Sequence, residues 1–185
     1  MKNLLFCAVG TLLAAGLFSG TANAAIEPLE HVTNASSICN GVRPSDEATL
    51  KSTAFDLRNT GQQAVYVNCT FVTLMDQGNG GGVGLYPVRY FGAYFTNHGV
   101  ATATVNCTGV QGYANNPDNV YDTMSVAVPP DSSGDSGTGY IFFEAPVGEP
   151  YYQNVSMTCV IPAGVGVADT YLGFNLDDAA SAPAL

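Results

Sequence analysis

The sequence predicts an all-β fold: a single antiparallel β-sandwich, of jelly-roll or immunoglobulin-like type, with about eight strands and two disulfides. Three observations carry this prediction. Apolar residues recur at every second position in several segments, as they do on the buried face of a strand. Turn-forming residues separate these segments at near-regular intervals. The apolar period of a helix is nearly absent, whereas parallel strands joined by crossovers would need helices.

The expected strands are rich in β-branched and aromatic residues, and each is bounded by Gly, Pro, Asn or Asp. Helix signal is confined to Ser45–Ser52, where a Ser cap could begin one turn. The segment Val83–Phe95 is long enough for two strands, and we expect the break near Gly92. In chain order the expected strands are Thr53–Arg58, Ala64–Met75, Val83–Phe95, Val100–Gly109, Met124–Val128, Gly139–Glu144, Asn154–Ile161 and Thr170–Leu176.

The two ends of the chain have the character of a targeting segment and a tail. Residues 1–24 begin with a basic Lys2, continue with an apolar core and end on Ala22-Asn23-Ala24, the small-x-small pattern of a signal-peptidase site. The apolar core is too short for a membrane span. We expect a signal peptide at 1–24, the sandwich at 25–176 and a disordered tail at 177–185. Export by the general secretory route would place the protein in the periplasm or outside the cell.

Four cysteines lie outside the expected signal peptide: Cys39, Cys69, Cys107 and Cys159. The last three fall on the apolar faces of alternating segments, such as "YVNCTFV" and "TVNCTGV". Catalytic thiols prefer electropositive, half-exposed surroundings, and structural zinc needs closely spaced ligands. We therefore expect two disulfides that pair thiols across the core. Of the three connectivities, strand order favours Cys39–Cys69 with Cys107–Cys159, and the other two stay open.

Composition and motifs argue against several function classes. The sequence has five basic and fifteen acidic residues, which gives a net charge of −10. It therefore lacks the clusters of Lys and Arg that bind nucleic acid. "GDSG" at 134–137 matches a serine-protease motif in four letters, but the context of such enzymes is absent around His98 and Ser136. "DQGNGGGVG" lacks the lysine of a phosphate loop. We expect no enzyme activity, no cofactor and no metal, with Asp131 and Asp135 as weak calcium candidates.

Tyrosines are the one residue type that suggests a binding surface. The chain has ten tyrosines and no tryptophan. A tyrosine offers an apolar ring and a hydroxyl, which suits sugar and peptide ligands as well as a sandwich core. The tyrosines are concentrated in "LYPVRYFGAYF", which also contains Phe91 and Phe95, and in "EPYYQ". A binding face and a packed core both stay open as interpretations of these segments. The candidate ligand-binding residues are Tyr86, Tyr90, Tyr94, Tyr151 and Tyr152.

The cysteine-bearing segments "AVYVNCTF", "TATVNCTGV" and "VSMTCVIPAGVGVADTYLGFNL" carry a family resemblance. They resemble a loose group of exported bacterial proteins without an assigned activity. In that group an early cysteine, a "v-x-C-x-x" strand and a late "C-x-x-P-x-G" recur before a tyrosine-bearing final strand. The matching positions here are Cys39, Cys69, Cys159, Pro162, Gly164 and Tyr171. The resemblance implies a sandwich and export, and it implies no activity.

Together these observations predict an exported, non-enzymatic β-sandwich that acts as a binding or structural module of the cell envelope or extracellular space. The alternative is a carbohydrate- or peptide-binding domain that uses a tyrosine-rich face, so a glycan or a protein would be the partner. A hydrolase is less favoured. A fimbrial subunit is also less favoured, because 25–38 lacks the alternation of a donor strand.

Overall fold

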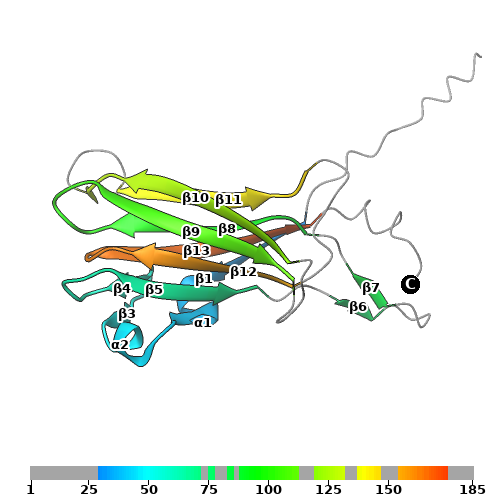
Figure 1. The fold of residues 1–185 in the computed structure, drawn as a ribbon, viewed down its shortest axis with the longest axis horizontal. Coiled ribbons are helices and arrows are strands. Elements are labelled where there is room, and N and C mark those ends of the chain that lie inside the picture. Colours follow the sequence, from blue (N-terminus) through cyan, green and yellow to red (C-terminus); the bar gives the residue numbers. More distant parts are fainter. Residues whose placement is uncertain are drawn as a thin grey trace, which may run out of the picture.

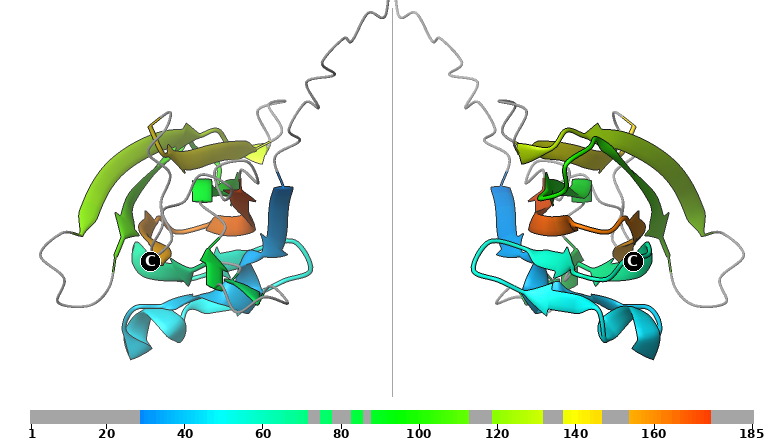
Figure 2. Two further views of the ribbon diagram at one scale, coloured as in Figure 1. Left: turned by 90° about the vertical axis from the view of Figure 1, so that its right-hand side faces the viewer. Right: turned by 90° about the vertical axis from the view of Figure 1, so that its left-hand side faces the viewer.

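Two antiparallel sheets pack face to face in the computed structural model of the chain (Figures 1 and 2). The structure describes residues 29–71, 75–77, 83–85, 88–112, 119–131, 137–146 and 154–174. The expected signal peptide (1–24) and tail (177–185) lie outside these residues. The strands run along the longest axis in Figure 1, and Figure 2 looks along them.

Sheet A has six strands, and sheet B has five. Sheet A contains, in spatial order, β11 (Thr138–Glu144), β8 (Val88–Asn97), β13 (Val165–Phe174), β4 (Leu57–Asn59) and β3 (Leu50–Ser52), with β1 (Leu29–Asn34) also paired to β13. Sheet B contains β10 (Val120–Val128), β9 (Ala103–Gln111), β12 (Val155–Ile161), β5 (Val65–Thr70) and β2 (Cys39–Gly41). The remaining elements are α1 (Ala35–Ile38), α2 (Pro44–Glu47) and the hairpin of β6 (Met75–Gln77) with β7 (Val83–Leu85).

The order of the eight main strands is that of a jelly roll. Taking β4, β5 and β8 to β13 as first to eighth, the first strand pairs with the eighth and the second with the seventh. The third pairs with the sixth, and the fourth pairs with the fifth. Four such antiparallel pairs, divided between two sheets, form the double Greek key of a jelly roll. The prediction of an all-β sandwich is therefore confirmed, and the jelly-roll alternative is the one adopted.

The core lies between the sheets and consists of the inward residues of the alternating strands. In β5 and β12 every second residue is buried and its neighbours are not, as the alternation predicts. Phenylalanines fill the middle of the core, where Phe91 stacks on Phe143 at a centroid distance of 5.2 Å. The largest fully buried side chains are Phe91, Phe95, Phe143, Phe174, Ile141, Met157, Ile161, Leu172, Val67, Val88, Val105 and Val128.

Both predicted disulfides are present, with the favoured connectivity Cys39–Cys69 and Cys107–Cys159. The expectation that they cross the core is wrong. Each joins directly opposed residues on neighbouring strands of sheet B, β2 with β5 and β9 with β12, at Cα distances of 4.0 Å. Opposed residues of an antiparallel pair are already close enough for a disulfide. Such disulfides fit an extracellular or periplasmic protein.

The described strands differ from the expected ones in five places. Of the expected strand Thr53–Arg58, only Leu57 and Arg58 are in a strand, at the start of β4. Residues 53–56 form a turn between β3 and β4, in which Thr53 Oγ1 accepts from the backbone N–H of Asp56. No break occurs at Gly92, since β8 runs through it. β10 and β13 begin earlier than expected, at Val120 and Val165. The segment expected to lack alternation contains β1, whose backbone pairs with β13.

Two asparagines form equivalent hydrogen-bond networks where the chain passes from sheet A to sheet B. Asn59 ends β4, and its Nδ2 donates to the carbonyl oxygens of Gln63 and Ile161. Asn97 ends β8, and its Nδ2 donates to those of Ala101 and Val128. Each Oδ1 accepts from the N–H two residues later. Because both side chains are buried and fully bonded, they satisfy carbonyl groups that the crossovers would otherwise leave unpaired.

No helix in the described part of the chain is long and apolar enough to cross a membrane.

Candidate ligand-binding face

The outer face of sheet A carries five aromatic rings side by side. They come from the three neighbouring strands β8, β11 and β13, and we call them the ring face: Tyr90, Tyr94, Tyr140, Phe142 and Tyr171. Their centroids are 5.1 to 5.9 Å apart, with tilted and edge-to-face geometries that aromatic pairs prefer. Tyr140 is 61% exposed, and the other four are half-buried. The face is therefore an open aromatic surface rather than a second core.

Strand alternation places these rings outward. On β8 the inward residues Phe91, Ala93 and Phe95 are buried, while Tyr90 and Tyr94 between them point to the other side. The same holds on β11, where Ile141 and Phe143 point inward. The sequence segment "YFGAYF" thus divides its aromatics between the core and the surface, because side chains two apart share a face and adjacent ones do not.

Two glycines let the rings lie down on the sheet. Gly173 pairs with Tyr90, and a Cβ there would be 2.2 Å from Cε1 of that ring. Gly92 pairs with Phe142, and a Cβ there would be 2.6 Å from its Cδ1. Both distances are far below van der Waals contact, so any larger residue at position 92 or 173 would force the ring beside it to move. Because these glycines have no side chains, the neighbouring aromatic rings can lie flat against the sheet.

Two glutamates border the ring face at the end of sheet A where β8 begins and β11 ends. Glu144 is the cross-strand partner of Tyr90, and Glu30 lies on β1 on the far side of Gly173. The hydroxyl of Tyr90 donates to Glu30 Oε1 over 2.8 Å. Glu30, Glu144 and four of the rings line a shallow depression of about 310 Å³.

The surroundings of Tyr90 hold its hydroxyl in the protonated form. Burial of the ring, the hydrogen bond to Glu30 and the negative charges of Glu30 and Glu144 together raise the pKa of Tyr90 to about 12. The pKa of Tyr171 is raised as well, by burial first and then by the charge of Asp169 and by Tyr94 and Glu30. Two tyrosine hydroxyls of the depression therefore stay neutral donors at any physiological pH.

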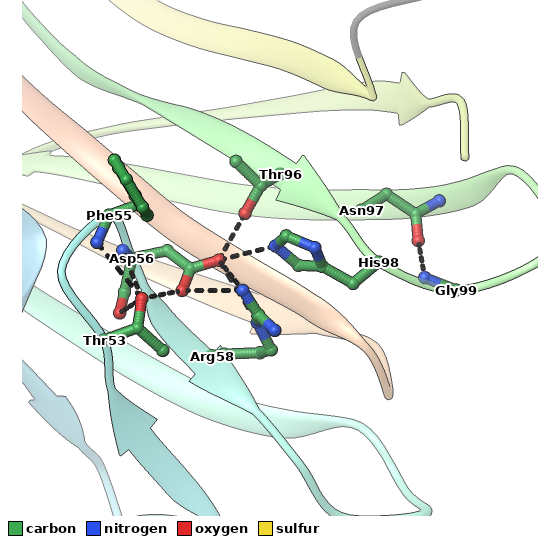
Figure 3. Close-up of polar contacts among 8 residues, drawn as sticks. All are labelled: Thr53, Phe55, Asp56, Arg58, Thr96, Asn97, His98 and Gly99. Carbon is green, nitrogen blue, oxygen red and sulfur yellow. Dashed lines mark hydrogen bonds and ion pairs between the residues drawn. The ribbon is translucent and has the colours of Figure 1, made fainter. Parts of the chain in front are cut away.

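A buried carboxylate stands at the opposite end of the same sheet face (Figure 3). Asp56 has no exposed surface and packs over Gly166 on β13. Thr53 and Thr96 donate to it over 2.6 and 2.7 Å. Arg58 Nη2 forms an ion pair with it at 3.2 Å, and His98 Nε2 lies within hydrogen-bond distance at 2.9 Å.

This network ties together three parts of sheet A. Burial acts to raise the pKa of Asp56, but hydrogen bonds from Thr53, Thr96 and His98 and the charge of Arg58 outweigh it and hold that pKa below its usual range. The turn before β4, the end of β8 and the start of β13 therefore meet at one ionised carboxylate. Its oxygens are occupied by internal partners, so its role in the described structure is structural.

The sequence-predicted binding residues divide into two groups. Tyr90 and Tyr94 belong to the ring face, whereas Tyr86, Tyr151 and Tyr152 lie outside the described residues. Sequence reasoning missed Tyr140, Phe142 and Tyr171. The signal for Tyr140 and Phe142 was present in "TGYIFFE", where these aromatics alternate with the core residues Ile141 and Phe143. Which of the two faces was buried could not be read from that segment alone.

The outer face of sheet B is different in character. One row across its five strands reads Asn40, Asn68, Thr158, Thr108, Thr123. The neighbouring rows are also uncharged, and apart from Tyr66 and Tyr121 their residues are small. Cross-strand hydrogen bonds join several of them, including Thr158 Oγ1 to Asn68 Oδ1 at 3.0 Å and Ser125 Oγ to Asn106 Oδ1 at 2.6 Å. This face thus presents hydroxyl and amide groups that already bond to one another.

The other chemical candidates find no site in the described residues. Asp131 is exposed, and Asp135 lies outside the described part of the chain. Among the described residues no group of three or more His, Cys, Asp or Glu side chains could hold a metal ion. His98 is engaged with Asp56, and Ser136 is not among the described residues.

Comparison with known proteins gives distant likenesses in fold only. No family model and no curated protein matches the chain. The carbohydrate-binding module TmCBM61, solved in complex with β-1,4-galactotriose, is similar at 13% identity and a TM-score of 0.39 over 79% of this chain and 88% of that one. An exo-β-1,3-galactanase from Phanerochaete chrysosporium with galactose is similar at 14% identity and a TM-score of 0.39, over 29% of its length and 79% of this chain. A CBM4 structure is similar at 10% identity and a TM-score of 0.31, over 94% of its length and 80% of this chain.

Proposed function

We propose that the protein is an exported, non-enzymatic carbohydrate-binding module whose ligand lies on the ring face of sheet A. The observation that carries the proposal is the open cluster of five rings with two carboxylates at its border. Exposed aromatic patches of this kind mark interaction sites, because water contact with so many rings is unfavourable unless a ligand covers them.

The functional groups of the site suit a sugar. The rings offer apolar faces on which the C–H side of a pyranose can stack, and they lie beside donors and acceptors that its hydroxyls can reach. The hydroxyl of Tyr171 is a neutral donor, and Glu144 is an acceptor. The hydroxyl of Tyr90 donates its proton to Glu30, so toward a ligand its oxygen is an acceptor, as are the remaining lone pairs of Glu30. A volume of about 310 Å³ is at the lower end of small-ligand sites and would hold one or two sugar residues.

A peptide ligand is the less favoured alternative. Extended peptides commonly add to the open edge of a sheet through backbone hydrogen bonds. The rings, however, lie on the flat face of sheet A and extend from the edge strand β11 across β8 to β13, so most of the site lies away from the edge. The closest polar groups are side chains rather than unpaired backbone groups.

The test is a glycan array followed by titration of the strongest polysaccharide or oligosaccharide. Tyr140→Ala removes an exposed ring of the face, and Tyr94→Ala removes the ring that contacts three others. Each should weaken binding by about threefold to tenfold, the usual contribution of an aromatic contact. The chain contains no tryptophan, so tyrosine emission is unmasked, and four of its ten tyrosines belong to the ring face.

Tyr121→Ala is the matched control. Tyr121 is 65% exposed, close to the 61% of Tyr140, but it lies on β10 in the other sheet. The control should bind like the native protein. Equal loss in both variants, or no binding to any glycan by a folded protein, would rule out the ring face as a carbohydrate site.

A further inference from the structure

The ring face is bounded by two carboxylates that form no ion pair with any basic residue in the described part of the chain, and from this we propose that its ligand carries an ammonium group. This inference rests on the proposed function and narrows it: the sugar bound would be an amino sugar with a free, protonated amine. The ammonium would sit in the depression between Glu30 and Glu144, over the rings of Tyr90 and Tyr171.

The arrangement of the two glutamates supports this placement. Glu144, Tyr90, Gly173 and Glu30 form one row across β11, β8, β13 and β1. The ring of Tyr90 lies over the glycine, and its hydroxyl reaches Glu30. Both carboxylates therefore border the same ring, and they lie at opposite ends of the row. A cation above that ring would be attracted to both at once.

The basic residues of the described chain are engaged elsewhere. Arg43 pairs with Asp46, and Arg58 pairs with Asp56 at the opposite end of the face. Arg89 donates to the carbonyl oxygen of Pro146, and Lys51 lies on β3 at the sheet edge away from the depression. Within the described residues no ion pair involves Glu30 or Glu144. His31 follows Glu30 on β1 and is exposed.

The aromatic walls add a second attraction for the same group. A cation within about 6 Å of a ring centroid is drawn to the negative face of the ring, and the attraction grows when the cation is partly shielded from water. Three tyrosines and one phenylalanine line the depression together with the two glutamates. A neutral sugar can use the rings and donate hydroxyl hydrogen bonds to the carboxylates, but it leaves both negative charges uncompensated. An ammonium uses the rings and the charges together.

The experiment compares two oligosaccharides that differ only at the amine. A glucosamine oligomer has free amines, and the N-acetylglucosamine oligomer of the same length has neutral amides. Choline chloride is the third probe, an ammonium that is not a sugar. Binding is measured by calorimetry near pH 6 in low salt, where the amines are charged and screening is weak. We expect the native protein to prefer the amine by ~10-fold.

The charge is removed without loss of shape by Glu30→Gln and Glu144→Gln, singly and together. A glutamine at position 30 can still accept from Tyr90. In the double variant the affinity for the amine should fall more than the affinity for the neutral oligomer, so that the preference for the amine drops to about twofold or less. Asp131→Asn, which removes an exposed carboxylate far from the depression, is the matched control and should keep the native preference.

The outcomes separate the inference from the function on which it rests. If the neutral oligomer binds as well as the amine and the Gln variants change nothing, the ammonium inference fails and the carbohydrate site stands. If choline binds, the Gln variants abolish that binding and no sugar binds, then the ammonium site stands and the carbohydrate assignment fails. If none of the three probes binds the native protein, the ammonium inference is overturned, and the glycan array alone decides the carbohydrate site.

Discussion

The hydroxyl of Tyr90 on β8 reaches Glu30 on β1 across the intervening strand β13, and the two atoms lie 2.8 Å apart. The two residues are 60 positions apart in sequence. The bond exists because position 173 between them is a glycine, over which the ring can lie. It fixes both the ring and one carboxylate of the depression.

Glu30→Gln should lower the pKa of Tyr90 from about 12 toward its ordinary value, because the hydrogen bond to a charged acceptor and the nearby charge both raise it. The measurement is an alkaline titration followed by NMR of ring-labelled tyrosine. Glu144→Gln is the comparison, and its effect should be smaller because Glu144 acts on Tyr90 only through its charge. An unchanged pKa in Glu30→Gln would contradict the described contact.

Gly173→Ala should disrupt the ring face while the sandwich stays folded. The added Cβ would lie 2.2 Å from the Tyr90 ring, so the ring must lift and the hydrogen bond to Glu30 must break. We expect glycan binding to fall and the pKa of Tyr90 to drop in the same variant. A far-ultraviolet circular dichroism spectrum should remain native. Retained binding with a native Tyr90 pKa would show that the ring does not occupy this position.

Asp56→Asn should cost about 2–4 kcal/mol of the free energy of unfolding, because Arg58 and His98 lose a buried charged partner. Urea unfolding at neutral pH measures this. Asp131→Asn removes an exposed carboxylate and should change stability by about 0.5 kcal/mol or less. Equal stabilities of the two variants would mean that the network in Figure 3 does not hold the sheet.

Stability should also fall in acid, and Asp56 should account for part of the fall. Its pKa is lower in the folded protein than in the unfolded chain, so its contribution is present above the unfolded pKa and is lost as the pH falls through the folded one. The window is therefore below about pH 4. In Asp56→Asn the stability curve should be flatter there. Asp46, whose pKa Arg43 lowers, should still titrate in that variant.

Removal of either disulfide by paired Cys→Ala substitution should destabilise the fold by roughly 3–4 kcal/mol in the chain-entropy account. The Cys107–Cys159 pair closes a span of 52 residues against 30 for Cys39–Cys69. Its loss should therefore cost about 0.5 kcal/mol more. Urea unfolding of the two variants gives the order. The reverse order would show that residual structure in the unfolded chain dominates.

Much of the fold could be predicted from alternation and turn residues. The strands containing Cys69, Cys107 and Cys159 were predicted within a few residues, because their buried positions alternate cleanly. The start of β13 was not predicted, because Gly164 and Gly166 resemble turn residues. In the structure Gly164 has a positive φ, and Gly166 leaves room for the side chain of Asp56. β1 was missed because it is an edge strand whose side chains are mostly exposed.

The site could be predicted only in part. Tyr90 and Tyr94 stood out because aromatics are dense around them, but density does not say which rings face water. Glu30 was not a candidate at all, because its role depends on β1 lying beside β13. Cross-strand register brings such distant residues together, and register is set by the whole sandwich rather than by any local pattern.

Leu29 at the start of β1 is the direct partner of Phe174 at the end of β13, so the described part of the chain begins and ends at one point. A load applied through the flanking segments would pull two adjacent antiparallel strands apart, and their hydrogen bonds would open one after another from that end. Glu30 is the first residue behind the opening. Mechanical tension would thus detach one carboxylate from the depression before it reached the two cross-linked strand pairs of sheet B.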